Sequence, residues 1–268
     1  MKKFEGILIL SDLDGTLLDS DRQISRENRE AVRYFVSEGG RFSMATGRSR
    51  TGMQYFLKDV DVNAPAVICN GAVVYDFERD TIIRSLPVGQ PGYELTLDLM
   101  ERFPEVGIEV TLLDGEFVAQ GSLITRIHFE KVKIPYRPMP PQNIPQPWVK
   151  LNLTMEAGKI DALTEYIRTV YPGRFHAQHS APYFYEILAP GATKGAGALF
   201  VCQHLGIKPR DLYVVGDGQN DVELLGCTRN LFAPANAHPD VLRLNPTLLP
   251  DCDHSPIAAL IRLLDKNR

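Results

Sequence analysis

Two aspartates that follow the first aliphatic run have the types and spacing for metal or acid–base chemistry. Asp12 and Asp14 come directly after Ile7–Leu10, and open α/β sheets bind their ligands at the carboxyl ends of such strands. Residues two apart in extended chain face the same side, so the two carboxylates are expected to converge. Unpartnered carboxylates repel, so the pair indicates a metal site or a division between base and acid. The alternative is an Asp-rich turn closed by Gly15.

A second acidic loop repeats this arrangement. The aliphatic run Leu212–Val215 ends in Gly216–Asp221, which contains Asp217. Carboxylate oxygens at neighbouring strand ends suit Mg²⁺, which takes one or two carboxylates together with substrate phosphate oxygens. The sequence therefore predicts a Mg²⁺ site and a phosphorylated substrate. The spacing of Gly216 and Gly218 imitates a dinucleotide fingerprint, but Asp221 stands at its sixth position and an acidic loop would repel a pyrophosphate.

Two other segments offer groups that could bind a phosphate. Thr46-Gly47-Arg48 supplies a hydroxyl and backbone N–H groups at an expected helix start, which predicts an anion site or, alternatively, a plain N-cap. Lys194 lies in the glycine-bounded entry to another expected helix. Its ammonium could neutralise a phosphoryl group or the aspartates, although a solvated lysine at a helix end is commoner.

The elements that must position these residues read as a doubly wound α/β fold. Continuous aliphatic runs indicate strands buried on both faces, and the opening section reads as a βαβαβ unit with right-handed crossovers. Ser25 is expected to cap the first helix, which Gly39-Gly40 ends. The expected strands are 7–10, 42–45 and 66–69, with a short helix at 51–58 between the last two. A mostly parallel sheet follows from this order.

The pattern changes in the middle of the chain. Residues 73–188 contain alternating segments, a hairpin signal at Asp114-Gly115 and a proline-rich stretch at 135–147. Helical spacing at 93–102 and 159–170 completes an α+β insertion. The α/β rhythm resumes with helices at 196–205, from 221 and at 257–264, around the strand 212–215. We therefore predict one α/β core formed by 1–80 and 189–268, and an inserted α+β domain, 81–188.

Composition restricts the function further. The 268 residues carry a formal net charge of −4 with no basic run, which argues against a nucleic-acid partner. The four cysteines are far apart and form no C-x-x-C pair, so they are expected to be buried thiols in a reducing cytosol. The N-terminal apolar run is too short for a signal peptide or a membrane span. We expect a cytoplasmic monomer or weak homo-oligomer without a membrane partner.

The order of four motifs resembles the haloacid dehalogenase superfamily. The motifs are Asp-x-Asp-Gly-Thr, Ala-Thr-Gly-Arg, a lone lysine before a helix, and Gly-Asp-Gly-x-Asn-Asp, within 7–72 and 186–221. The chain looks most like the Cof-type branch of sugar-phosphate phosphatases, which carries an α+β cap, and Asn70-Gly71-Ala72 also fits that branch. The resemblance implies Mg²⁺-dependent hydrolysis of a small phosphorylated metabolite, with a sugar phosphate as the expected substrate. It also implies that 1–80 and 189–268 form the catalytic core and that 81–188 form the cap that selects the substrate.

The resemblance also implies a role for each matching residue. Asp12 would attack phosphorus and form an aspartyl-phosphate, while Asp14 would protonate the leaving oxygen and then deprotonate water. Thr46 and Lys194 would orient and neutralise the phosphoryl group. The implied substrate-binding set is Thr46, Gly47, Arg48, Asn70 and Lys194. The implied Mg²⁺ set is Asp12, the Asp14 carbonyl and Asp217, with Asn220 or Asp221 in support.

One departure and two alternatives remain at this level. Pro234–Ala237 stands where the branch usually has Met-Gly-Asn-Ala, and on this ground Asn236 is left out of the site. One alternative is a phosphomutase, which uses the same nucleophile and cap type. The other is a phospho-ligand binding protein without turnover, which keeps the same fold.

The basic residues of the cap form either a solvated face or contacts to a leaving group. They are Arg126, His128, Lys131, Lys133, His176 and His179.

Overall fold

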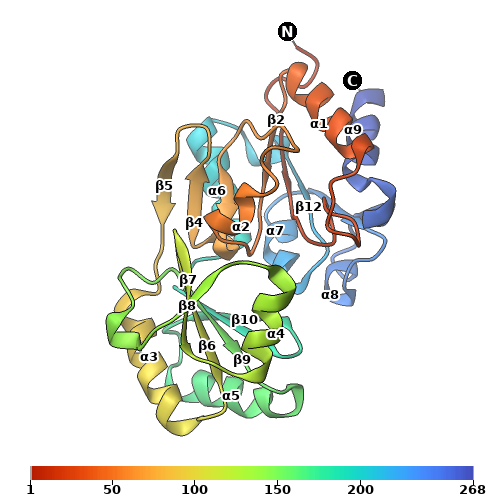
Figure 1. Cartoon of the computed structure of the whole chain (residues 1–268). Helices are drawn as coiled ribbons and strands as arrows, with labels where there is room; N and C mark the ends of the chain where they lie inside the picture. The colour runs from red at the N-terminus through yellow and green to blue at the C-terminus, as the bar shows by residue number, and fades with distance from the viewer. Residues whose placement is uncertain (1, 268) are drawn as a thin grey trace. The chain divides into compact units, whose positions relative to one another are not determined.

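The computed structural model describes residues 2–267 as two compact units (Figure 1). Among the described residues, the first unit contains 2–48, 53–84 and 193–267, and the second contains 49–52 and 85–192. The second unit is thus inserted into the chain of the first. No helix in the described part of the chain is long and apolar enough to cross a membrane.

The first unit is built on a five-stranded sheet in the order β14-β13-β12-β1-β2, and its four strand pairings are all parallel. β1 and β12 occupy interior positions and are formed by the two aliphatic runs, as predicted. The carboxyl ends of β2, β1 and β12 therefore meet at one edge. The strands are β1 (Leu8–Ser11), β2 (Arg41–Met44), β12 (Leu212–Val215), β13 (Asn230–Pro234) and β14 (Thr247–Leu249).

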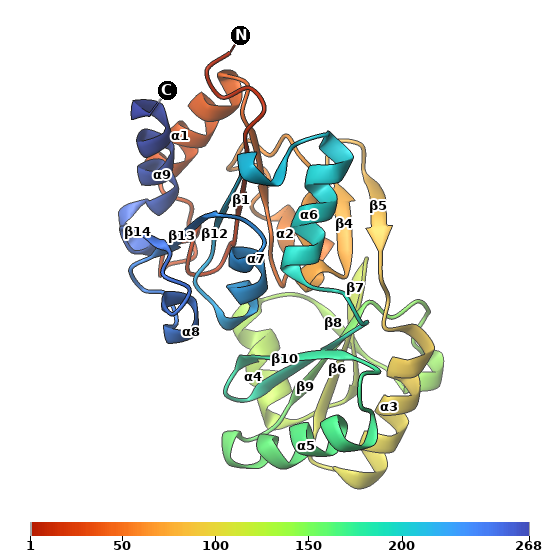
Figure 2. The same ribbon diagram turned by 180° about the vertical axis from the view of Figure 1, so that it is seen from behind.

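Helices α1 (Arg26–Ser37) and α9 (Pro256–Lys266) lie side by side (Figures 1 and 2). The Ser25 hydroxyl accepts a hydrogen bond from the Asn28 amide, which confirms the predicted N-cap. Gly39 ends α1 at a φ of +90°, a conformation that glycine adopts most readily. The buried Asn28 side chain also accepts a hydrogen bond from the Ala258 amide, so it joins the two helices.

Helices α6 (Lys194–Leu205) and α7 (Val222–Gly226) pack against each other and share one apolar cluster with the sheet. Val201 of α6 and Leu224 of α7 are both fully buried in this cluster. The short helix α8 (Pro239–Leu242) and α9 each begin at a proline, where the missing N–H costs no hydrogen bond. The closely spaced prolines of the tail therefore mark element boundaries.

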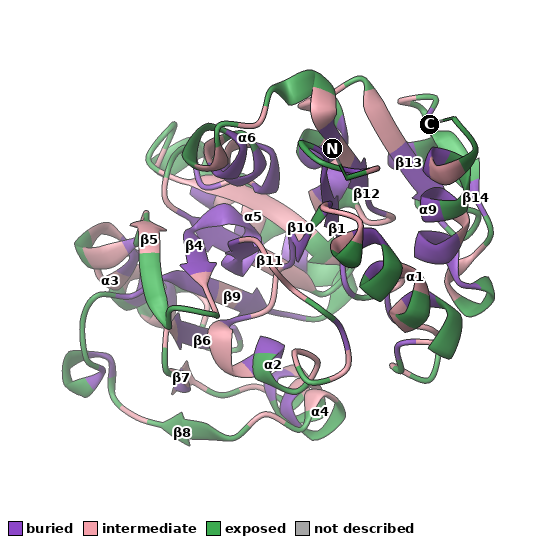
Figure 3. Cartoon of the chain, turned by 90° about the horizontal axis from the view of Figure 1, so that it is seen from above, coloured by how far each residue is buried: buried purple, intermediate pink, exposed green. Residues whose placement is uncertain are grey.

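Two sequence expectations for the first unit need correction. β3 (Ala66–Ile68) does not extend the parallel sheet as a full strand: it touches it through one bridge, Ala45 with Val67, and pairs antiparallel with β4 (Val73–Asp76). β5 (Thr81–Ser85) is the exposed edge of this small sheet (Figure 3). The helix expected at 51–58 is only α2 (Arg50–Gln54), because the chain continues as tight turns from Met53 onward.

The second unit is a six-stranded mixed sheet in the order β10-β11-β9-β6-β7-β8. Its apolar face is covered by helices α3 (Gly89–Arg102) and α5 (Ala157–Val170), whose buried leucines and isoleucines share a cluster with the strands. The predicted hairpin joins β6 and β7, with Leu113 and Asp114 between them. The strands are β6 (Gly107–Leu112), β7 (Gly115–Gln120), β8 (Tyr136–Pro138), β9 (Lys150–Thr154), β10 (His176–Ala181) and β11 (Phe184–Leu188).

The opposite face of the second unit's sheet is polar, because side chains alternate along each strand. Lys150 and Glu186 form a buried ion pair at 2.9 Å. Glu109 contacts His128 of α4 (Leu123–Val132), a helix that sequence periodicity did not reveal. Among the six basic residues noted in the sequence, His128 thus pairs with Glu109, and Arg126 pairs with Glu130 within α4.

The cysteines follow the sequence expectation only in part. None of the four forms a disulfide, and Cys69 and Cys202 are buried as expected. Cys227 and Cys252 are partly exposed, which corrects the expectation that all four are core residues.

Candidate active site

Asp12 is held at the carboxyl end of the central strand β1. Its amide donates to the Val215 carbonyl at 2.8 Å, so the β1–β12 ladder continues to this residue. Ser11 donates its hydroxyl to the Asp12 carbonyl. The Asp12 residue is only 6% exposed. The sheet therefore fixes both the position and the burial of this carboxyl group.

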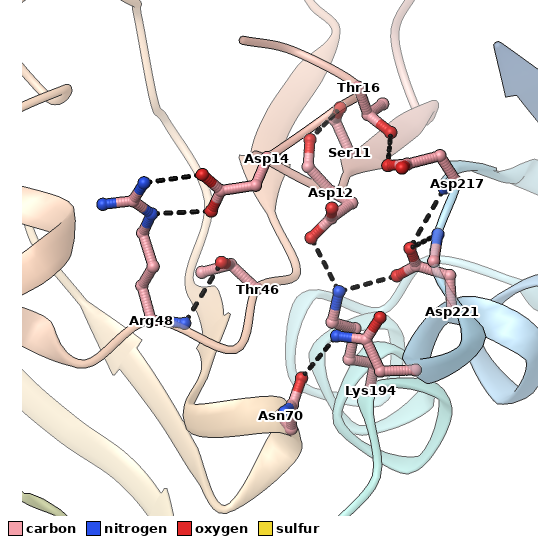
Figure 4. Close-up of polar contacts among 12 residues, drawn as sticks. Ser11, Asp12, Asp14, Thr16, Thr46, Arg48, Asn70, Lys194, Asp217 and Asp221 are labelled. Atoms are coloured by element: carbon pink, nitrogen blue, oxygen red, sulfur yellow. Dashed lines mark hydrogen bonds and ion pairs between the residues drawn. The ribbon is translucent and has the colours of Figure 1, made fainter. Parts of the chain in front are cut away.

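Lys194 is the buried counter-charge of Asp12. Its Nζ lies 2.6 Å from Asp12 Oδ1 and 2.6 Å from Asp221 Oδ1, and its side chain has no exposed surface (Figure 4). Thr193 caps α6 directly before it, by accepting a hydrogen bond from the Ala196 amide. The solvated lysine considered from the sequence is therefore wrong, because α6 begins inside the site.

Asp221 organises the second acidic loop. One carboxylate oxygen accepts hydrogen bonds from the amides of Asp217 and Gly218, and the other accepts from Lys194. The Asp221 residue is completely buried. Its carboxylate thus shapes the loop and orients the lysine at the same time.

Asp217 faces the turn that follows Asp12. Thr16 donates its hydroxyl to Asp217 Oδ1 at 2.6 Å. Gly15 has a φ of +77°, and a Cβ at this position would lie 2.5 Å from Asp217 Oδ2. Only glycine fits this approach. Thr16 was not among the predicted site residues, so its contact with a carboxylate 201 residues away is a finding of the structure.

Asp14 does not converge with Asp12, contrary to the spacing argument. The chain turns after Asp12, where the Leu18 amide donates to the Leu13 carbonyl, so the alternation of extended chain no longer applies. The Asp14 carboxylate instead accepts two hydrogen bonds from Arg48, at 2.6 and 2.7 Å (Figure 4). Its side chain is 49% exposed. The carboxyl groups of the two aspartates therefore have separate environments and can take separate roles.

Thr46, Asn70 and Asn220 lie beside this centre. Thr46 follows β2, is 1% exposed, and its hydroxyl accepts from the Arg48 amide at 3.2 Å. Its carbonyl accepts from the Asn70 amide. Asn220 donates its side-chain amide to Asn70 Oδ1 at 3.0 Å. No helix begins at Thr46, because α2 starts only at Arg50, so the helix-start part of the anion-site expectation is wrong.

Gly47 and Gly71 allow close approaches around Asn70. A Cβ at Gly47 would lie 3.1 Å from Asn70 Nδ2. Gly71 has a φ of +93°, and a Cβ there would lie 2.0 Å from the Thr193 carbonyl oxygen. The Asn70-Gly71 turn is therefore packed directly against the residue that caps α6.

Burial controls the ionisation of these groups. It raises the pKa of the Asp12 carboxyl well above its usual range, with a further rise from the charge of Asp221 and an opposing effect of Lys194. Burial likewise raises the pKa of Asp217 to about 6, although the Thr16 hydrogen bond acts against it. Burial alone would lower the pKa of Lys194, but the charges of Asp12 and Asp221 outweigh it and raise that pKa.

The donor set fits a hard divalent cation. Carboxylate oxygens of Asp12, Asp217 and Asp221 lie within 4.8 Å of one another, and a single ammonium, that of Lys194, pairs with two of these groups. Asp221 already has both oxygens engaged, so Asp12 and Asp217 are the carboxylates best placed to ligate. Mg²⁺ typically takes one or two carboxylates in this way.

The fold and the site together define an α/β protein with a buried carboxylate–lysine centre at the carboxyl ends of its strands. The sequence profile of the haloacid dehalogenase-like hydrolases matches residues 9–261. The chain belongs to this family. The family and enzyme class that the four motifs indicated are thereby confirmed.

Individual relatives agree with this assignment. YxeH of Bacillus subtilis is 29% identical over 251 residues, which cover 88% of this chain and 89% of YxeH. An HMP-PP phosphatase of Escherichia coli O8 is 29% identical over 256 residues, covering 91% and 89% of the two chains. Both similarities extend across the inserted unit.

Solved structures show the same fold. A haloacid dehalogenase-like hydrolase from Bacteroides thetaiotaomicron superposes with a TM-score of 0.86 at 20% identity, covering 96% of this chain and 99% of its own. The HAD subclass IIB sugar phosphatase BT4131 gives a TM-score of 0.85 at 19% identity, covering 97% and 99%. The predicted fold class, an α/β core with an inserted α+β part, is confirmed.

Proposed function

We propose that the chain is a Mg²⁺-dependent phosphatase that hydrolyses a small phosphorylated metabolite through an aspartyl-phosphate on Asp12. The observation that carries this proposal is the Lys194 ammonium, buried and 2.6 Å from the Asp12 carboxylate. Such a pair places a nucleophile and a phosphate-neutralising charge at one point. The named activity of the HMP-PP phosphatase relative also supports it.

In the first step, an Asp12 carboxylate oxygen attacks phosphorus. The bond from phosphorus to the leaving oxygen breaks, and that oxygen keeps the electron pair and takes a proton from Asp14. In the second step, Asp14 removes a proton from water, whose oxygen attacks phosphorus, and the bond to Asp12 breaks. Asp14 suits this shuttle because its carboxylate is half exposed, whereas that of Asp12 is buried.

Mg²⁺ would be held by Asp12, Asp217 and the Asp14 carbonyl, with Asn220 and Asp221 nearby. When bound, it supplies positive charge to the phosphoryl oxygens. Lys194 and Thr46 orient the transferring group, and Gly47, Arg48 and Asn70 complete its surroundings. Arg48 also holds the Asp14 carboxylate by its two hydrogen bonds.

For the substrate we propose a sugar phosphate or a related small monoester, selected by a cap formed by residues 81–188. The named substrate class of BT4131 and its similar fold support this choice. A net charge of −4 with no basic run suits a small ligand better than a polyanionic polymer.

The decisive experiment measures phosphate release from sugar phosphates and p-nitrophenyl phosphate, with and without Mg²⁺, for the wild type and Asp12→Asn. We expect release only with Mg²⁺, and a loss of at least about a thousandfold in the isosteric variant, because an amide is not a nucleophile here. Equal activity of both proteins would exclude Asp12 as the nucleophile. Stimulation by a sugar bisphosphate with little phosphate release would favour a phosphomutase, and a wild type inert to every ester would favour a binding protein.

A further inference from the structure

The side chain of Asn236 bridges two distant backbone segments of the first unit. Its Nδ2 donates to the Gly15 carbonyl at 2.9 Å, and its Oδ1 accepts from the Cys252 amide at 2.8 Å. The residue lies in the turn after β13 and is itself exposed. Both hydrogen bonds go to backbone groups, so they depend on where the main chain lies at Gly15 and at Cys252.

The Gly15 end of this bridge lies at a close approach between two segments of the candidate site. Gly15 passes so close to Asp217 that no Cβ fits, and the next residue, Thr16, donates its hydroxyl to Asp217 Oδ1. A small shift of this turn would break the 2.6 Å contact or press the backbone against the carboxylate. The orientation of Asp217 therefore depends on where the Gly15 carbonyl is held.

The segment that carries Asn236 also holds Asp217, which accepts the Thr16 hydrogen bond. The His238 amide donates to the Asp217 carbonyl at 2.8 Å, two residues after Asn236. One short segment thus fixes the backbone of Asp217 with its main chain and the backbone of Gly15 with a side chain.

The Cys252 end of the bridge belongs to a segment that also contacts Ser20. Cys252 begins the short helix η5 (Cys252–His254), and Asp253 of this helix accepts a hydrogen bond from the Ser20 amide at 2.7 Å. The chain from Gly15 to Ser20 is therefore fastened at both ends to one framework. Asn236 supplies the link at the end nearest Asp217.

We propose that Asn236 is a positioning residue for the divalent cation: it holds the Gly15-Thr16 turn so that the Thr16 hydroxyl aims the Asp217 carboxylate at the metal. The inference rests on the proposed function only for the identity of the cation site. Asn236 acts through Gly15 and Thr16 and contacts no reacting group. Its effect belongs to cation affinity and not to the chemical step.

The test is calorimetric titration of the full-length protein with MnCl₂ or MgCl₂ alone, without any phosphate ester. We compare the wild type with Asn236→Asp, which keeps the acceptor and loses the donor to Gly15, and with Asn236→Ala, which loses both. Loss of one such hydrogen bond is expected to weaken cation binding about three- to tenfold. Asn143→Asp, an equal charge change at an exposed asparagine of the second unit, should bind like the wild type.

A double-mutant comparison separates positioning from a general loss of structure. If Asn236 acts through Thr16, Asn236→Ala should weaken cation binding in the wild type but by less than about twofold in a Thr16→Val background. Phosphate release should show the same pattern in its Mg²⁺ requirement, with kcat at saturating Mg²⁺ within about twofold of the wild type.

Several results would overturn the inference. They are unchanged cation affinity in both Asn236 variants, equal weakening with and without Thr16, or a fall in kcat that saturating Mg²⁺ does not restore. Circular dichroism establishes that each variant is folded before titration. Failure of the proposed function looks different, because then Asp217→Asn would bind the cation as the wild type does, or the wild type would bind the cation and release no phosphate.

Discussion

At the scale of single residues, the candidate site separates its carboxyl groups by environment. Asp12 is buried against Lys194, whereas Asp14 is half exposed and held by Arg48. A buried carboxylate beside a fixed ammonium suits attack on phosphorus, and a carboxyl group near solvent suits proton transfer to and from water. Asp14 therefore carries a prediction that can be tested apart from Asp12.

We expect Asp14→Asn to affect poor leaving groups more than good ones. An alkoxide leaving from a sugar phosphate needs a proton, so kcat/KM should fall about a hundred- to ten-thousandfold. Nitrophenolate needs none, so the first step with p-nitrophenyl phosphate should slow far less. Burst kinetics with both substrates measure the step. Equal losses for the two leaving groups would remove Asp14 from the acid role.

At the scale of elements, the site depends on how α6 begins. Its first residue is Lys194, its cap is Thr193, and the Gly71 turn packs against the Thr193 carbonyl. A buried lysine at a helix start is unusual, and here the preceding turn and the two carboxylates hold it in place. The start of this helix therefore sets the position of the counter-charge.

We expect Gly71→Ala to lower the free energy of unfolding by about 2–4 kcal/mol. A methyl group at this position would meet the Thr193 carbonyl oxygen at 2.0 Å, and the φ of +93° is unfavourable for alanine. Urea denaturation measures the change. Gly158→Ala is the matched control: its Cβ would meet nothing within 4 Å in helix α5, so a gain of about 0.5–1 kcal/mol is expected. Equal stability of Gly71→Ala and the wild type would contradict the close packing.

At the scale of the whole molecule, each of the two compact units has its own core, and their stabilities can be followed separately. Trp148, the only tryptophan, is fully buried in the core of the second unit, so its fluorescence reports the unfolding of that unit. Phosphate release would report the unfolding of the first unit. Because the polar face of the second unit's sheet carries buried ionisable groups, we expect the stability of this unit to depend on pH.

Glu116 on β7 is the group expected to cause this dependence. Burial raises its pKa from 4.5 to about 7, against the opposing effects of a Thr111 hydrogen bond and the Lys150 charge. A carboxyl group whose pKa is raised on folding stabilises the fold fully below pH 4.5, and this contribution is lost as pH rises through about 7. The free energy of unfolding of the second unit should therefore decrease between these values.

The isosteric variant Glu116→Gln tests the assignment. Its amide does not titrate, so the Trp148 unfolding midpoint in urea should vary less with pH than that of the wild type. At pH 8 the variant should be more stable, by on the order of 1–3 kcal/mol. Glu101→Gln, an exposed glutamate of α3, should follow the wild-type curve. A Glu116 variant with the wild-type pH dependence would show that another group is responsible.

Local pattern was sufficient to predict the strand ends that build the candidate site. Aliphatic runs predicted β1 and β12, and parallel neighbours necessarily bring their carboxyl ends together, so Asp12 and Asp217 were expected on one edge. The Ser25 cap and the glycines after α1 were equally local signals. These inferences succeeded because burial on both faces and capping depend on residues close in the sequence.

Predictions from sequence spacing failed where the chain stops being extended or where contacting residues are distant in the sequence. The turn after Asp12 directs Asp14 to Arg48, and no periodicity encodes that turn. The hydrophobic pattern did not predict helix α4, because Leu123 and Ile127 are exposed and its apolar residues therefore do not mark one buried face. The cap role of residues 81–188 and the roles of the site residues stay predictions.

The aspartates after the first strand show most clearly which properties the sequence determines and which the tertiary structure decides. The sequence by itself determined which residue types stand at the ends of the central strands, and hence the family and the class of chemistry. Only the tertiary structure decided that Lys194 is buried between Asp12 and Asp221, that Thr16 orients Asp217, and that Asn236 fastens the turn. These contacts join segments up to 221 residues apart, and their geometry depends on packing that local pattern does not contain.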